Sequence, residues 1–224
     1  MVTSILLFTL HALFPAMALS SPGSTRILFF GDSITELGVQ PDGYISQLRV
    51  MIKASDRDSL YELIGAGIGG NKVYDLYLRL ETDVLARKPD VVVIFVGVND
   101  VWHKRTFGTG TDPDKFMKFY EAIIAKLQEH NIRLMLTTPA CIGEKPDCSN
   151  DLDGELNHYS QIIRDLAARY SCTLVDLRKE FARCEQAQNK GNAEKGILTT
   201  DGVHFNKRGN EVAARLFATA LGIE

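Results

Sequence analysis

The feature that most restricts the fold is an alternation along the chain. Short apolar runs rich in β-branched and aromatic residues alternate with longer segments whose apolar residues recur at helical spacing. This alternation is typical of βαβ units, in which helices join parallel strands. The run VVVIFV at 91–96 is apolar without alternation, which indicates a central strand covered on both faces. We expect strands at 26–30, 61–64, 91–96, 133–138 and 173–177.

Five segments between or after these runs are predicted to be helices, and they span 46–53, 73–86, 113–129, 156–170 and 209–221. The apolar stripe within 115–127 indicates core packing rather than a ligand site. The sequence therefore predicts an α/β fold, a three-layer α/β/α sandwich with a five-stranded parallel sheet. Residues 26–224 suit one domain of about 200 residues.

Polar, glycine-rich blocks follow three of the predicted strands, and a fourth block lies near the C-terminus. They are GDSIT at 31–35, GAGIGGN at 65–71, GVND at 97–100 and DGVHFN at 201–206. The carboxyl ends of parallel strands lie at one edge of a sheet, where ligands bind in folds of this kind. We therefore expect the four blocks to meet at one site.

In identity and order these blocks resemble those of the SGNH (GDSL) hydrolase family, and the likeness extends over residues 26–221. The resemblance implies a flavodoxin-like SGNH hydrolase fold and a serine esterase or acylhydrolase with no cofactor and no metal. It further implies that Ser33 is the nucleophile, that His204 is the general base and that Asp201 is the partner of His204.

The chemistry of these residue types agrees with that assignment. A serine hydroxyl is a weak nucleophile unless a base accepts its proton, and a histidine base needs a third group to hold its tautomer. Asp201 and His204 are three residues apart. In a helical turn that carboxylate would reach one imidazole nitrogen while the other faces Ser33.

The resemblance also implies an oxyanion hole made of the backbone N–H groups of Ser33 and Gly70 and the side-chain amide of Asn99. A neutral amide suits this role because it donates a hydrogen bond without carrying a charge. The second block departs from the family, which commonly has Asn where Gly65 stands. Gly69 is as open to a close backbone approach as Gly70, so it is the alternative donor.

Simpler roles exist for each residue taken singly. Asp32 is predicted to cap a helix, Asn99 and Asp100 fit capping positions, and His204 fits a solvent-facing site ahead of the last helix. Capping does not explain why all the blocks fall at one edge of the sheet. An ordinary α/β-hydrolase is disfavoured, because Thr35 stands where the pattern G-x-S-x-G has glycine.

Three other functions stay open. A metal-dependent phosphoesterase would use as ligands Asp32, Asn99, Asp100 and His204, a set with only one histidine. A flavodoxin-like module would bind phosphate or flavin in the glycine loops, although G-x-G-x-x-G follows the second strand rather than the first. A sugar-binding relative without catalysis is the third.

Trp102 and Phe107 follow the Asn99 block and are predicted to contact substrate, since an aromatic wall suits a sugar face or an apolar chain. The segment 139–156, rich in Gly, Pro, Asp and Asn, follows the fourth strand and is expected to shape the acyl pocket. We expect a short acyl ester of a sugar or other alcohol as substrate. The alternative is lysophospholipase-like or thioesterase-like action on longer acyl chains.

Residues 1–25 contain no Lys, Arg, Asp or Glu, and the stretch 5–19 is almost wholly apolar. The stretch is shorter than a spanning helix, contains Pro15 and offers Ala-Met-Ala at 16–18 for cleavage. We predict a signal peptide and linker, and export to the periplasm or the medium. Because no basic residue precedes the apolar stretch, the alternatives are an uncleaved membrane anchor and a misassigned start codon. Such an anchor would be the only membrane contact that we expect.

The net charge of −3 gives no electrostatic footprint for nucleic acid, so no such partner is expected. Four cysteines are present, and their spacing argues against a zinc site. In an exported chain we predict a disulfide between Cys141 and Cys148, which bracket a short loop with Gly143 and Pro146. Free buried thiols are the alternative.

Overall fold

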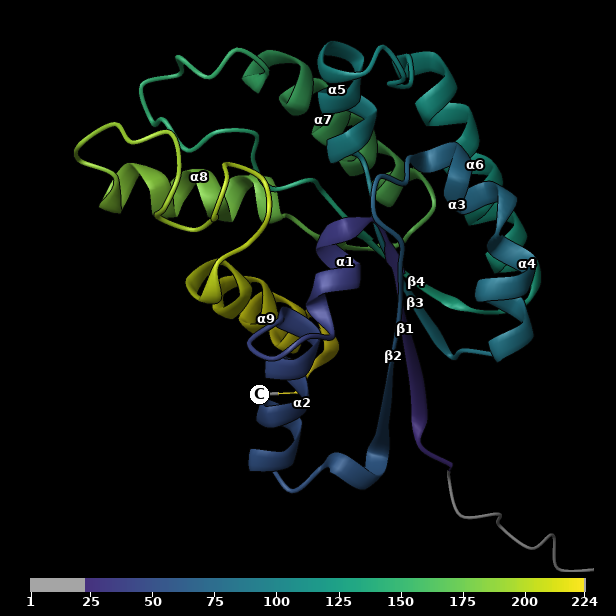
Figure 1. Cartoon of the computed structure of the whole chain (residues 1–224). Coiled ribbons are helices and arrows are strands. Elements are labelled where there is room, and N and C mark those ends of the chain that lie inside the picture. Colours follow the sequence, from purple (N-terminus) through teal and green to yellow (C-terminus); the bar gives the residue numbers. More distant parts are fainter. Residues whose placement is uncertain (1–22, 224) are drawn as a thin grey trace, which may run out of the picture.

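The computed structural model describes residues 23–223, which form one parallel sheet between two layers of helices (Figure 1). The sheet order is β2-β1-β3-β4-β5. Its strands are β1 (Thr25–Gly31), β2 (Tyr61–Gly67), β3 (Val91–Phe95), β4 (Arg133–Thr137) and β5 (Thr173–Val175). The predicted three-layer sandwich with a five-stranded parallel sheet is confirmed.

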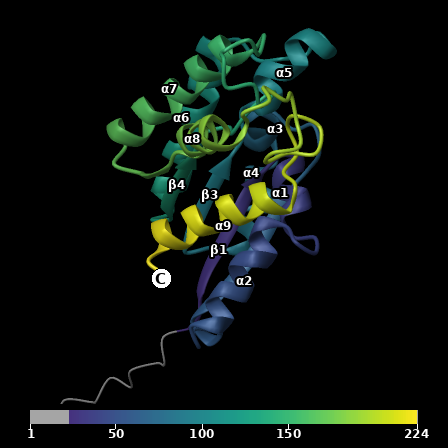
Figure 2. The ribbon, with the colours of Figure 1, turned by 90° about the vertical axis from the view of Figure 1, so that its left-hand side faces the viewer.

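The two helical layers lie on opposite faces of this sheet, as the two views show (Figures 1 and 2). One layer contains α1 (Ser33–Gly38), α2 (Tyr44–Ala54), α8 (Leu177–Gln188) and α9 (Lys207–Leu221). The other contains α3 (Val73–Leu78), α4 (Leu80–Asp83), α6 (Pro113–Glu129) and α7 (Asp153–Arg169). Helix α5 (Val98–Thr106) follows β3 at the carboxyl end of the sheet.

The central strands are apolar throughout because each face of the sheet packs against its own core. In β1, Ile27 and Phe29 join the core beneath α2 and α9, whereas Leu28 and Phe30 join the core beneath α3 and α6. All five residues of β3 are buried. Successive side chains of a strand point to opposite faces, so a strand covered on both faces must be apolar without alternation.

The predicted helix at 73–86 is divided in the structure into α3, α4 and a short 3-10 turn (Leu85–Arg87). The division occurs at Arg79, whose backbone angles, φ −107° and ψ 11°, are not those of an α-helix. The Arg79 guanidinium donates hydrogen bonds to the carbonyls of Gly31 and Ala66, at 2.8 and 3.1 Å. The break therefore allows a polar side chain to reach the ends of β1 and β2.

The predicted disulfide between Cys141 and Cys148 is wrong. All four cysteines lie within the described residues and are free thiols. Cys141 is buried, and its Sγ donates to the carbonyl of Gly202 at 3.7 Å, whereas Cys148 is exposed. Burial raises the pKa of the Cys141 thiol well above its usual range. The sequence shows a short flexible loop between the two cysteines but not that one side chain turns inward.

The predicted signal peptide lies almost entirely outside the described residues, which begin at position 23. Between residues 23 and 223, none of the helices combines the length and the apolar composition that a membrane span requires.

Phe29 and Phe107 offer a matched test of this packing. Phe29 is fully buried, while Phe107 is 68% exposed. We expect Phe29→Ala to lower the free energy of unfolding by about 3–5 kcal/mol, because the buried ring leaves a cavity. Phe107→Ala should change it by less than about 0.5 kcal/mol. Urea titration of both variants measures the difference, and equal losses would contradict the described core.

Candidate active site

Ser33 lies at the point where β1 passes into α1. The Asp32 side chain accepts a hydrogen bond from the N–H of Ile34 at 3.0 Å and so caps the helix, as predicted. The end of β2 packs closely against this turn at Gly67, where a Cβ would lie 2.0 Å from the backbone nitrogen of Glu36. Only glycine allows this approach, which fixes the Ser33 helix against the sheet.

Ser33, His204 and Asp201 are joined by two hydrogen bonds. Ser33 Oγ and His204 Nε2 are 2.9 Å apart, and His204 Nδ1 and Asp201 Oδ2 are 2.7 Å apart. The imidazole thus bridges a hydroxyl and a carboxylate through its two nitrogens. This geometry suits proton transfer from the hydroxyl, with the carboxylate holding the ring.

The Asp201–His204 segment is a bend rather than the helical turn that the spacing suggested. The other carboxylate oxygen of Asp201 accepts hydrogen bonds from the backbone N–H groups of Val203 and His204, at 2.9 and 2.8 Å. Burial alone would raise the pKa of Asp201, but the hydrogen bonds from the His204 ring and these N–H groups outweigh it and lower that pKa. The carboxylate therefore stays ionised beside the imidazole, and the 46% exposure of its side chain to water favours the same charged form.

The glycine loop that contains Gly70, the predicted oxyanion donor, approaches Ser33 at Gly69, the alternative donor. A Cβ placed on Gly69 would lie 3.9 Å from Ser33 Cβ, and Gly70 has a left-handed φ of +77°. Asn99 is buried in the first turn of α5 and donates from Nδ2 to the carbonyl of Asn71 at 3.1 Å. Because a carboxamide carries two N–H groups, this bond orients the amide and leaves a donor for a ligand.

Two basic residues not singled out from the sequence hold the glycine loop of the second block. Arg79 Nε donates to Asn71 Oδ1 at 2.7 Å, which connects the loop to the ends of β1 and β2. Lys72, almost fully buried, donates from Nζ to the carbonyl of Gly70 at 3.2 Å. The Asn71 carbonyl that orients Asn99 is therefore fixed from both sides. In the sequence Arg79 stands four residues from both Asp75 and Asp83, the spacing of an ordinary polar helix face, so no signal marks it.

Asp32 and Asp100 are buried carboxyl groups behind the site. Burial raises the pKa of Asp32 to about 7, against the lowering effect of the hydrogen bond from the Ile34 N–H. Burial raises the pKa of Asp100 to about 7 as well, although the Val73 N–H donates to its carboxyl group. With pKa values near neutrality, neither carboxyl carries a full negative charge at pH 7, so both place limited charge behind Ser33 and Asn99. Among residues 23–223 no group of three or more His, Cys, Asp and Glu side chains is arranged to hold a metal ion.

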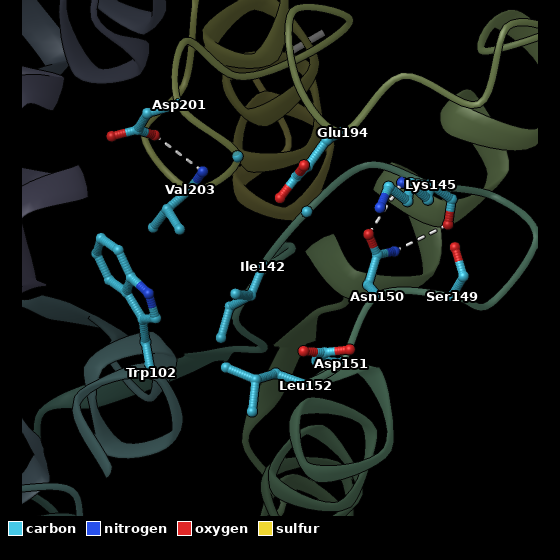
Figure 3. A pocket seen from close by; sticks show the side chains of 12 residues that line it. Trp102, Ile142, Lys145, Ser149, Asn150, Asp151, Leu152, Glu194, Asp201 and Val203 are labelled. Carbon is cyan, nitrogen blue, oxygen red and sulfur yellow. Dashed lines mark hydrogen bonds between the residues drawn. The ribbon is translucent and has the colours of Figure 1, made fainter. Parts of the chain in front are cut away.

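A cavity of about 250 Å³ opens beside Asp201 (Figure 3). Trp102 forms one wall, and its ring lies edge-on to the His204 ring with centroids 6.4 Å apart. The segment 139–156 supplies Ile142, Gly143, Lys145 and 149–152. Glu194 and residues 201–203 of the fourth block complete the lining. Phe107 does not line it, since its ring packs against His103. The lining is mainly polar, which differs from the apolar wall of an acyl pocket.

Comparison with known proteins gives a consistent result. A solved structure of an acetyl xylan esterase, AlAXEase, is 57% identical, with a TM-score of 0.87 over 88% of this chain and 99% of that chain. An acetylxylan esterase of Geobacillus stearothermophilus is 28% identical over 215 residues, 89% of this chain and 94% of its own length. A Bacillus subtilis (strain 168) protein named uncharacterized lipoprotein YqeF is 25% identical over 239 residues, 93% of each.

The family comparison matches residues 29–212, a range that contains all four sequence blocks. The resemblance inferred from those blocks is thereby confirmed, as is the enzyme class, a carboxylic ester hydrolase. The chain belongs to the GDSL-like lipase/acylhydrolase family.

Proposed function

We propose that this enzyme is a serine esterase that removes a short acyl group, acetyl above all, from a sugar ester through an acyl-enzyme on Ser33. The observation that carries the proposal is the pair of hydrogen bonds from Ser33 Oγ to His204 Nε2 and from His204 Nδ1 to Asp201 Oδ2.

In the proposed reaction Ser33 Oγ attacks the acyl carbonyl while its proton passes to His204 Nε2. The resulting imidazolium, stabilised by the Asp201 carboxylate, then donates that proton to the departing alcohol oxygen as the ester bond breaks. Water attacks the acyl-enzyme by the same route, with His204 again as the base. The products are the free alcohol, the carboxylic acid and the regenerated serine.

The proposed oxyanion hole combines the backbone N–H of Ser33, the backbone N–H of Gly70 and the side-chain amide of Asn99. The carbonyl of Asn71 supports this role, because it fixes the amide before substrate arrives. Donors held in advance stabilise the developing negative charge without reorganising during the reaction.

Two observations support a short acyl group on a sugar. Three of the similar proteins and structures are named as an acetylxylan esterase, an acetyl xylan esterase and an acetyl-xylooligosaccharide esterase. The cavity beside Asp201 has the Trp102 ring at one side and polar groups of Lys145, Asp151 and Glu194 farther from that ring, beyond Ile142 and Leu152 (Figure 3). Polar groups around an aromatic face suit sugar hydroxyls and ring C–H groups, whereas a long acyl chain needs an apolar wall. We therefore assign the segment 139–156 to the alcohol side of the substrate rather than to its acyl side.

We also infer that the enzyme is exported and meets its substrate outside the cytoplasm. The apolar, uncharged N-terminal sequence and the lipoprotein name of the Bacillus subtilis relative support this inference.

Ser33 should be the residue modified by a fluorophosphonate, because only a serine paired with a base is reactive enough. Mass spectrometry of the labelled enzyme identifies the site, and Ser33→Ala should abolish both labelling and esterase activity. Ser149→Ala, which changes a serine in the wall of the cavity beside Asp201, should leave labelling intact. A label on another residue, or activity removed by EDTA and restored by a divalent ion, would overturn the proposed mechanism.

Asn99→Ala should lower kcat by about 10²- to 10³-fold, or about 2.7–4 kcal/mol, because it removes an oxyanion donor. KM should change little, since the amide is proposed to contact the transition state rather than the bound ester. Steady-state kinetics on an acetyl ester, with the thermal midpoint recorded to show that the variant is folded, measures the effect. A normal kcat with a raised KM would assign Asn99 to substrate binding instead.

Comparing Trp102→Ala with Phe107→Ala tests whether Trp102 contacts the sugar of the substrate, with Phe107 as the control aromatic residue outside the cavity. Only Trp102 lines the cavity. Its loss should raise KM for an acetylated xylo-oligosaccharide by about tenfold, or about 1.4 kcal/mol, while KM for 4-nitrophenyl acetate changes less. Phe107→Ala should affect neither. Faster hydrolysis of palmitoyl than of acetyl esters by the wild-type enzyme would contradict the proposed substrate class.

A further inference from the structure

Glu144, in the segment 139–156, carries a fully buried carboxylate that contacts the segment leading to Asp201 and His204. Its Oε2 accepts a hydrogen bond from the N–H of Ile197 at 2.7 Å. Its Oε1 accepts from the N–H of Leu198 at 2.8 Å, and from both the N–H and the hydroxyl of Thr199. One side chain therefore holds three consecutive backbone amides.

Backbone contacts extend this connection on both sides. The N–H of Glu144 donates to the carbonyl of Glu194 at 3.0 Å, and the N–H of Gly143 donates to the carbonyl of Gly202 at 2.8 Å. The Thr199 hydroxyl, which donates to Glu144, accepts in turn from the N–H of Gly202 at 3.0 Å. Residues 197–199, before Asp201, are thus hydrogen-bonded to Glu144, and Gly202, after it, is hydrogen-bonded to Gly143.

The anchored turn directly precedes the pair proposed to act in catalysis. The Thr200 N–H donates to the His204 carbonyl at 2.8 Å, and Thr199 pairs with Phe205 in an isolated antiparallel bridge. A shift of residues 197–199 would therefore move His204 together with Asp201. Ser33, by contrast, is held independently at the end of β1.

The charge of the carboxylate is balanced by hydrogen-bond donors rather than by a cation. No ion pair found within residues 23–223 includes Glu144. Removing such an acceptor leaves several buried donors without a partner, which disfavours the observed turn. Pure packing does not require a buried carboxylate at this position.

We propose that Glu144 is a positioning residue that sets the His204 imidazole at hydrogen-bonding distance from Ser33 Oγ. The assignment rests on the proposed roles of Ser33, Asp201 and His204. Glu144 acts through the 197–202 turn, so its loss should displace the base without removing any group that contacts substrate.

Glu144→Gln is the primary test, because the amide keeps the side-chain shape while presenting an N–H group to a backbone donor. We expect kcat on an acetyl ester to fall by about 10- to 100-fold, as for other outer contacts of catalytic groups, with KM little changed. The low-field proton resonance of the His204 Nδ1–H should shift or broaden. A purely stabilising role would lower the thermal midpoint but leave that resonance and the kcat of the folded enzyme unchanged, and this result would overturn the proposal.

Glu185→Gln is the matched control, because Glu185 is also buried but makes no hydrogen bond to the 197–204 segment. Its kcat should remain at the wild-type value, and a loss equal to that of Glu144→Gln would overturn the proposal. If Glu144→Gln does not fold, Thr199→Val decides by the same readouts, since it removes the hydroxyl between Glu144 and Gly202. Ser33→Ala separates the failure of the serine mechanism from the failure of the Glu144 proposal. Esterase activity retained in Ser33→Ala would contradict the serine mechanism. The His204 Nδ1–H resonance of Glu144→Gln tests the positioning role of Glu144 without relying on that activity.

Discussion

The reversal of strand order beside β1 is the constraint on which the site depends. β2 lies on one side of β1 and β3 on the other, so the chain leaves β1 and β3 toward opposite helical layers. A crevice forms where such connections diverge. Ser33 follows β1 and Asn99 follows β3, while the glycine block at the end of β2 packs against the Ser33 turn. Hydrogen bonds from Arg79 hold the ends of β1 and β2 together at this edge of the sheet.

Much of this arrangement could be predicted because its signals are local. A strand buried on both faces must be apolar throughout, so VVVIF indicated the centre of the sheet, and the predicted helix at 113–129 coincides with α6. The blocks at 31–35, 65–71, 97–100 and 201–206 could be placed at one edge because three of them follow strands. Helices α1, α5 and α8 were missed, since α1 is a short turn and the other two are largely polar.

The contacts that could not be predicted join segments far apart in the chain. Glu144 meets residues 197–199 more than fifty positions away, and nothing around it in GEKPD distinguishes a buried acceptor from a loop carboxylate. The sequence predicts a continuous helix through Arg79, because periodicity depends on apolar residues and not on the carbonyls that a guanidinium reaches. For Cys141 the loop length was visible, but the inward direction of the side chain depends on Gly202.

The distance in sequence between Ser33 and His204, 171 positions, has a consequence for biosynthesis. Ser33 emerges from the ribosome long before His204, and the hydrogen bond between them can form only after β2, β3, β4 and β5 have been added. Under the proposed mechanism, a nascent polypeptide that ends before His204 therefore carries a serine without its base, and this serine behaves as an ordinary alcohol.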